Sequence, residues 1–388
     1  MRASLTVRQL SRWETGDPPP LPQPAQQQLL EVVLGAPLEE LGFVVPPHRR
    51  TSRSRGGGDT GRQDVVRGGP GGGPGVLSDS AGRVGGAVDV AGVRDELAAL
   101  YRMADQRGGV PAQARAAALG RYLTQALDAA SLPPSVIRDL EAALAELACH
   151  RAWCVYDYDT SGAAARVASL EAVTTTQLTG HPLLQVRALG GHALVAMRSG
   201  RVWEARSAVE RAGELARAAG AGPAVHRVIA LREAGAATRA GDQAVARRAL
   251  SRAVYYHARA DRDQEDVPVW AGSTGQVEID YATAAWHRRD GQPARAVPFL
   301  RNAVSAAGAG HARNAALYRS RLALTLLEAR EVEEACGEIG RVLDGAGEVV
   351  SGRLRARLAE FAAVAAATGA AVVADPVDRI RERLRAAV

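Results

Sequence analysis

One spacing recurs in the second half of the chain and constrains its fold more than any other feature. A glycine is followed after five residues by a small residue, after four more by an aliphatic residue, and after three more by another small residue. The three copies are Gly200, Ala205, Val209 and Ala212; Gly241, Ala246, Leu250 and Ala253; and Gly291, Ala296, Leu300 and Ala303. A weaker fourth copy consists of Arg330, Ala335, Ile339 and Val342.

Each of the three glycines follows a run with helical apolar spacing, where it can end the helix in a left-handed conformation. The next helix then presents small, large and small residues on one face. Small residues let two helices approach closely, and the large residue fills the groove between them. The pattern predicts helical hairpins whose packing depends on the three glycines and the six alanines.

Composition agrees with an all-α fold, since only 4 % of the residues are aromatic and 47 % are hydrophobic. The net charge of +6 is spread along the chain and argues neither for nor against nucleic acid. The first residues contain no apolar signal segment, and no stretch is long and apolar enough to cross a membrane. Three cysteines without a secretory context favour a reduced, cytoplasmic protein.

Three regions separate on composition. Residues 1–45 have helical pattern interrupted by prolines, and residues 46–90 are so rich in glycine that we expect a flexible, disordered linker. Residues 91–388 show helix after helix, and the last segment ends in an amphipathic stripe of Val377, Ile380, Leu384 and Val388. That stripe predicts either a capping helix or a dimer contact.

The glycine-led spacing is similar to the second half of a tetratricopeptide repeat (TPR). The copies lie 41, 50 and 39 residues apart, which is longer than the standard unit. The resemblance therefore implies a degenerate TPR-like α-solenoid over 91–388, with a groove for a peptide or protein ligand. An irregular all-helical domain is the alternative.

The N-terminal region contains a short helix pattern in the segment TVRQLSRWETG. Thr6 is a suitable N-cap, and Leu10 and Trp13 share one face. Arg8, Gln9 and Arg12 lie on the opposite face and can donate hydrogen bonds.

TVRQLSRWETG, followed by LGAPLEELGF, resembles the recognition helix and last helices of repressor-type (xenobiotic-response-element, XRE family) helix-turn-helix regulators. The combination with TPR-like repeats is similar to a group of such regulators from high-GC bacteria. The later fragments AWCVYDYD, DVPVWAGSTGQVEIDYATAAWHRRDGQPARAV and SGRLRARL extend this resemblance over most of the chain outside the linker.

The resemblance implies a DNA-binding site made by the N-terminal region. In that family the recognition helix enters the major groove. Thr6 would contact phosphate, Arg8 and Gln9 would read bases, and Arg12 would reach base or phosphate. Leu10 and Trp13 would form the helix-turn-helix core. The expected phosphate contacts from the basic segment that follows are Arg49 and Arg50.

The family's two preceding helices have no counterpart before Thr6, so the sequence predicts a partial helix-turn-helix domain at 1–45. Two functions follow. In the first, the protein is a transcriptional regulator that binds DNA and senses a peptide or protein partner through its repeats, with a possible homodimer. In the second, it is a TPR-like interaction scaffold that has lost DNA binding.

No arrangement of residues predicts an enzyme, a metal site or a cofactor. Cys149, His150 and Cys154 share one helix but lack further ligands, so we interpret them as buried thiols beside a half-exposed histidine. Asp157 and Asp159 are expected in a turn. The scarce aromatic residues either separate helix hairpins or line a groove, and the sequence leaves both roles open: they are Trp203, Trp270, Trp286, Tyr255, Tyr256 and Tyr281.

Overall fold

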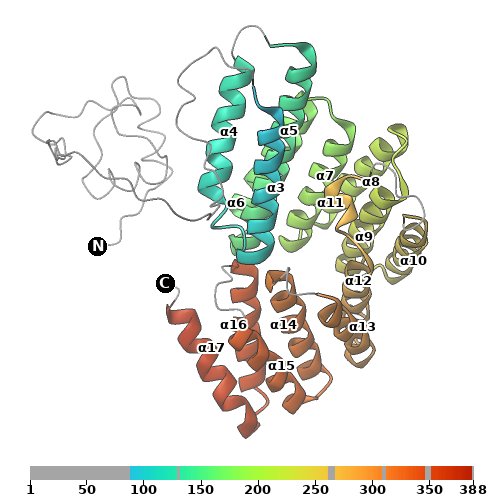
Figure 1. Ribbon diagram of the computed structural model, residues 1–388. Helices are drawn as coiled ribbons and strands as arrows, with labels where there is room; N and C mark the ends of the chain where they lie inside the picture. The colour runs from blue at the N-terminus through green and yellow to red at the C-terminus, as the bar shows by residue number, and fades with distance from the viewer. Residues whose placement is uncertain (1–87, 129–131, 261–266, 308–311, 346–350, 387–388) are drawn as a thin grey trace, which may run out of the picture. The chain divides into compact units, whose positions relative to one another are not determined.

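The computed structural model describes residues 88–128, 132–260, 267–307, 312–345 and 351–386, which all lie in one compact unit (Figure 1). Every regular element in these ranges is a helix. The first helices are α3 (Val90–Arg107), α4 (Gln113–Asp128), α5 (Pro134–Tyr158), α6 (Ala163–Leu178), α7 (Pro182–Arg198), α8 (Val202–Ala218), α9 (Pro223–Ala240) and α10 (Gln243–Ala260). The others are α11 (Val269–Gly272), α12 (Gln276–Arg289), α13 (Pro293–Ala306), α14 (Ala312–Glu328), α15 (Val332–Gly345), α16 (Gly352–Ala366), the 3₁₀ turn η3 (Ala371–Val373) and α17 (Ala374–Ala386).

The helices pack in consecutive pairs within the described part of the chain. The pairs are α5 with α6, α7 with α8, α9 with α10, α12 with α13, α14 with α15, and α16 with α17. Helix α3 begins at Val90 because the Asp89 side chain caps it by accepting a 2.9 Å hydrogen bond from the Gly92 amide. Helices α3 and α4 both pack against α5.

The recurring glycines lie at the turns inside three of these pairs. Gly200, Gly241 and Gly291 have φ angles of 71°, 79° and 71°, where a side chain would strain the backbone. Arg330, which takes the glycine's place in the fourth copy, also has a positive φ of 67°. The six alanines of the first three copies are buried with at most 1 % exposure: Ala205, Ala212, Ala246, Ala253, Ala296 and Ala303.

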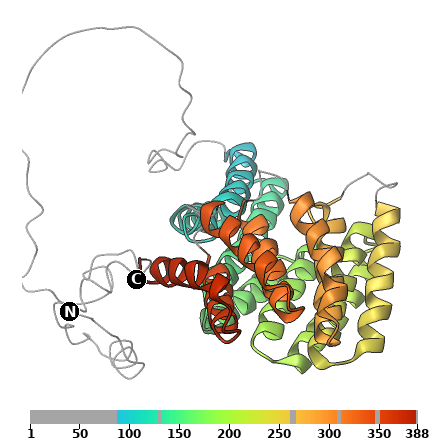
Figure 2. The same ribbon diagram turned by 90° about the horizontal axis from the view of Figure 1, so that it is seen from below.

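The last helices of this unit pack against its first helices. Helix α14 contacts α3, and α16 contacts α5, so the orange and red helices lie beside the blue and green ones (Figures 1 and 2). A Cβ atom on Gly352 would lie 2.0 Å from the carbonyl oxygen of Tyr158, so only glycine permits this approach. Gly109 also lies close to the last turns of α5, since a Cβ there would be 2.6 Å from the Cys154 carbonyl oxygen.

Helix α17 is the second helix of the last pair, and its apolar stripe faces the core. Val377 and Ile380 are buried against the core formed by α14, α15 and α16, and Leu384 packs against the same core. Val388 lies outside the described residues. None of the described helices is long and apolar enough to cross a membrane.

Candidate functional site

The predicted DNA-binding residues lie outside the part of the chain that the structure describes. This applies to Thr6, Arg8, Gln9, Leu10, Arg12, Trp13, Arg49 and Arg50. The candidate site in the described residues is instead a group of polar side chains where the two ends of the helical unit meet.

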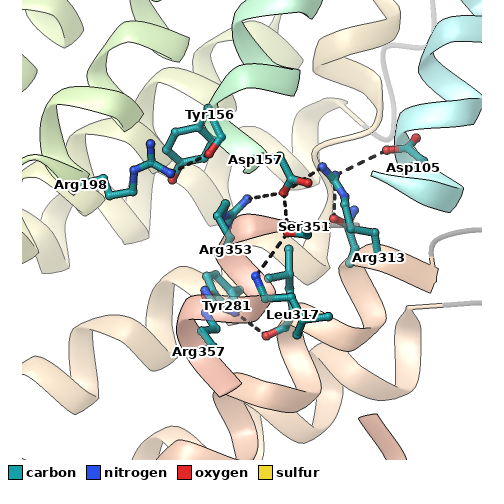
Figure 3. A network of polar contacts seen from close by, with 12 residues as sticks. Asp105, Tyr156, Asp157, Arg198, Tyr281, Arg313, Leu317, Ser351, Arg353 and Arg357 are labelled. Atoms are coloured by element: carbon teal, nitrogen blue, oxygen red, sulfur yellow. Dashed lines mark hydrogen bonds and ion pairs between the residues drawn. The ribbon is translucent and has the colours of Figure 1, made fainter. Parts of the chain in front are cut away.

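We call this group the central polar cluster (Figure 3). Its residues come from the first helix of each of the six pairs. They are Tyr156 and Asp157 of α5, Arg198 of α7, Arg232 of α9, Glu278 and Tyr281 of α12, Arg313, Tyr318 and Arg321 of α14, and Arg353 and Arg357 of α16, with Ser351 at the start of α16.

Asp157 is the anionic centre of the cluster and is fully buried. Its Oδ1 accepts a 3.1 Å hydrogen bond from the Ser351 hydroxyl and lies 3.4 Å from Nη1 of Arg313 and 3.9 Å from Nη1 of Arg353. Arg313, which is only 1 % exposed, also lies 3.7 Å from the Asp105 carboxylate of α3. One carboxylate therefore holds α5 to both α14 and α16.

Arginine guanidinium groups stack on aromatic rings beside Asp157. Arg198 and Arg353 lie 4.5 and 4.9 Å from the centre of the Tyr156 ring, and Arg198 donates a 2.6 Å hydrogen bond to the Tyr156 carbonyl oxygen. Arg313 lies 5.3 Å from the ring centre of Trp153. Such stacking is favourable for arginine because its flat guanidinium group is weakly hydrated.

A second layer of the cluster joins α12, α14 and α16. Arg357 donates hydrogen bonds to the Leu317 carbonyl oxygen and to the Tyr281 hydroxyl. The Tyr281 and Tyr318 rings are 5.2 Å apart, and the Tyr318 hydroxyl donates to Glu278. Burial and the Glu278 carboxylate both raise the pKa of Tyr318.

The ionisation of this layer reflects a strong positive potential. Burial raises the pKa of Tyr281, but the charges of Arg357, Arg321 and Arg353 outweigh it and lower that pKa to about 7. Burial, together with Arg321 and Arg353, lowers the pKa of the Arg357 guanidinium to about 10. The cluster thus favours a negative charge at the Tyr281 oxygen.

A separate polar centre lies between α3, α5 and α7, and we call it the Glu146 centre. Tyr101 donates a 2.8 Å hydrogen bond to Glu146, and Arg187 lies 3.4 Å from Glu146 and 5.2 Å from the centre of the Tyr101 ring. His150 packs edge-on against Tyr101 at 4.5 Å. This centre pairs one arginine with one carboxylate.

The cysteines and histidine singled out in the sequence lie next to these centres. Cys149 and Cys154 are buried, and burial raises the pKa of their thiols to about 11 and about 12. The expectation of a half-exposed histidine is wrong, because His150 is only 1 % exposed, covered by Tyr101 and α3. The described residues contain no group of three or more histidine, cysteine or acidic residues that could hold a metal ion.

The sequence patterns did not predict the central polar cluster, although three fragments of the family resemblance contain residues of it. The expectation that both aspartates lie in a turn is wrong for Asp157, which is buried in the last turn of α5. Asp159 follows that helix and accepts a 2.8 Å hydrogen bond from the Ala165 amide in the first turn of α6. The fragments AWCVYDYD, QVEIDYATAAW and SGRLRARL, which belong to the resemblance, carry Asp157, Tyr281 and Arg353, respectively. They meet at this one place in the fold.

The aromatic residues singled out in the sequence lie in three different surroundings. Tyr281 lies in the central polar cluster, whereas Trp270 and Trp286 pack against buried alanines and aliphatic residues between helices. Tyr256 packs against the buried core between α9, α10 and α12. Trp203 and Tyr255 are 80 % and 56 % exposed.

The fold and the cluster together define an all-helical protein of paired helices with an arginine-rich interior. In comparisons with known proteins, no family model matches the chain and no curated protein is similar to it.

Proposed function

We propose that this protein is a transcriptional regulator of the XRE helix-turn-helix type. Residues 1–45 would bind DNA, and a TPR-like α-solenoid over residues 91–388 would sense a peptide or protein partner. The support for DNA binding is the segment TVRQLSRWETG with its donor face of Arg8, Gln9 and Arg12. The protein acts in the cytoplasm and without a cofactor.

The observation that carries the sensory part of this proposal is the convergence of six first helices on one polar cluster. TPR-like arrays present the first helix of each pair toward a common inner face, where a ligand contacts several repeats at once. The fragments that carry the family resemblance contain residues of this cluster. The buried alanines of the repeated spacing lie instead between the two helices of each pair. A ligand held there would favour one arrangement of the helices and so change the placement of two DNA-binding regions in a dimer.

DNA binding is tested with the full chain and a library of fragments from its own genome. A retained fragment should dissociate as salt rises, because phosphate contacts release counterions. Arg8→Ala should weaken binding about tenfold, as expected for the loss of a bidentate contact with guanine. The matched control is Arg83→Ala in the glycine-rich segment, which should bind as the unchanged chain does.

The alternative is a TPR-like scaffold that does not bind DNA. Failure to retain any genomic fragment, or equal binding by the Arg8→Ala and Arg83→Ala variants, would favour this alternative. Amide hydrogen exchange adds an independent criterion, since a packed helix-turn-helix protects its backbone amides. Strong protection in residues 1–45 contradicts the scaffold alternative.

A further inference from the structure

The central polar cluster contains more guanidinium groups than carboxylates to neutralise them. Among the described residues, the carboxylates that face it are Asp157, Glu278 and the half-exposed Asp105. The arginines are Arg198, Arg232, Arg313, Arg321, Arg353 and Arg357.

Several of these arginines have buried donors without an acceptor. In the described residues, Arg232 makes neither a hydrogen bond nor an ion pair, and its Nε is buried. Arg198 Nη2 and Arg313 Nε are also buried without an acceptor. Burying a charge without a partner is costly, so a protein retains such groups only where something else compensates them.

Arg198, Arg232 and Arg353 are close to one another around Tyr156. Arg198 and Arg353 both stack on the Tyr156 ring, and Arg232 is repelled by Arg353 and attracted by Glu278. Burial, together with that repulsion, lowers the pKa of Arg232. The α16 N-terminus adds the positive end of a helix dipole beside Asp157.

Solvent reaches part of this group. The Arg353 side chain is 19 % exposed, and Arg198, Arg232 and Tyr156 are partly exposed, whereas Arg313 and Asp157 behind them are buried. The outer three arginines are therefore accessible to a small group, while the buried contacts of Asp157 with Arg313 and Ser351 keep α5 joined to α14 and α16.

We propose that the central polar cluster binds an oxyanion, a phosphate or carboxylate group of the effector, through Arg198, Arg232 and Arg353. The guanidinium fork matches the two oxygens of either group and forms strong, charge-assisted hydrogen bonds with it. Bound there, the anion neutralises the excess charge and stabilises the contact of the first helices with the last. The effector role rests on the proposed function, but the binding itself needs no DNA.

The test measures the melting temperature of the full chain with pyrophosphate or with citrate, against sodium chloride at matched ionic strength. A ligand that binds only the folded chain raises the melting temperature progressively with its concentration. We expect such a rise with at least one of the two anions. A rise with pyrophosphate alone identifies a phosphate site, and a rise with citrate alone identifies a carboxylate site.

Arg232→Gln separates this site from general salt effects. Arg232 makes neither a hydrogen bond nor an ion pair in the described structure, so the variant should fold, yet its apparent dissociation constant for the anion should increase about tenfold or more. The matched control is Arg211→Gln, which removes an exposed arginine paired with Glu214 at 2.8 Å and should respond as the unchanged chain does. Because phosphate and citrate also stabilise proteins by exclusion from their surface, that contribution should be equal in all variants.

Arg353→Lys gives a second test, because lysine retains the charge but loses the fork. It should also weaken anion binding. In the unchanged chain the phenolate absorbance of Tyr281 should decrease when the anion binds, since the charge of Arg353, which helps to lower the Tyr281 pKa, is then shared with the anion. The proposal is overturned if neither anion raises the melting temperature, or if both Arg232→Gln and Arg353→Lys respond as Arg211→Gln does. If the chain binds an anion but retains no DNA fragment, the proposed regulator function is contradicted and the oxyanion site is still supported.

Discussion

The two polar centres of this protein have similar residues but different charge balance. In the Glu146 centre, burial lowers the pKa of Arg187, but Tyr101, Cys149 and Glu146 outweigh it, so that pKa is raised overall. In the central polar cluster, burial and the neighbouring Arg353 leave the pKa of Arg232 lowered. The surroundings thus favour the charged form of Arg187 and disfavour the charged form of Arg232.

This difference separates a structural polar contact from a candidate binding site. The Glu146 centre is complete, since its tyrosine and its arginine both contact the Glu146 carboxylate, at 2.8 and 3.4 Å. The central polar cluster is complete only around Asp157, where α5, α14 and α16 meet. Of its outer arginines, Arg353 shares the Asp157 carboxylate at 3.9 Å, whereas Arg232 has a buried Nε and Arg198 a buried Nη2 without an acceptor. Substitutions in the two centres should therefore change the unfolding free energy by different amounts, and in some cases in opposite directions.

The largest effect is expected from Asp157→Ala. This variant leaves the buried Arg313 without its carboxylate at 3.4 Å and removes the acceptor for Ser351. Breaking a buried ion pair in this way costs about 3–5 kcal/mol of unfolding free energy. Urea denaturation measures this loss. The control is Asp378→Ala, which removes the carboxylate of an exposed ion pair with Arg381. A loss no larger than that control would mean that the two ends of the unit meet without this contact.

Glu146→Gln should destabilise less. The glutamine retains an acceptor for the Tyr101 hydroxyl but leaves Arg187, whose side chain is 12 % exposed, without an anion. We expect a loss of about 1–3 kcal/mol in unfolding free energy by urea denaturation. The variant should respond to pyrophosphate and citrate as the unchanged chain does. A lost anion response would show that the two centres are not independent.

Acid should destabilise the protein through His150. Burial, followed by the charge of Arg187, lowers the pKa of folded His150 to about 3, while the unfolded histidine binds a proton near its ordinary pKa of about 6.5. Since the unfolded chain binds more protons in this window, the contribution is complete above about pH 6.5 and is lost as the pH falls toward about 3, at up to about 1.4 kcal/mol per pH unit.

The measurement is a series of urea denaturations at decreasing pH. The unfolding free energy of His150→Gln should depend on pH less steeply than that of the unchanged chain. His181→Gln, at the N-cap of α7, is the control and should retain the steep dependence. Identical slopes for all three proteins would contradict a lowered pKa of His150 in the folded state.

The smallest effect on stability is expected from Arg232→Gln. Because this guanidinium makes neither a hydrogen bond nor an ion pair in the described structure, its removal should lower the unfolding free energy in sodium chloride by less than about 0.5 kcal/mol, or increase it. Urea denaturation in sodium chloride checks this. A large loss of stability would mean that Arg232 contributes to packing rather than to binding.

The sequence predicted the helical class and the local chemistry of the turns from short-range patterns. Gly200, Gly241 and Gly291 follow helical segments, and the structure places them at positive φ, where glycine is favoured. The buried alanines five residues later follow from the same spacing. The site was not predicted, because Asp157 and Ser351 are 194 residues apart and no local pattern pairs them.

What the sequence determined by itself is therefore whatever depends on neighbours within a few helical turns: the helices, their glycine turns and the small residues between paired helices. Which buried polar groups meet was decided only by the tertiary structure. Gly352 lets α16 approach the α5 backbone, and that approach brings Asp157 within reach of Arg313 and Arg353. Charge balance is a property of such long-range contacts, because the energy of a buried ion depends on everything that surrounds it.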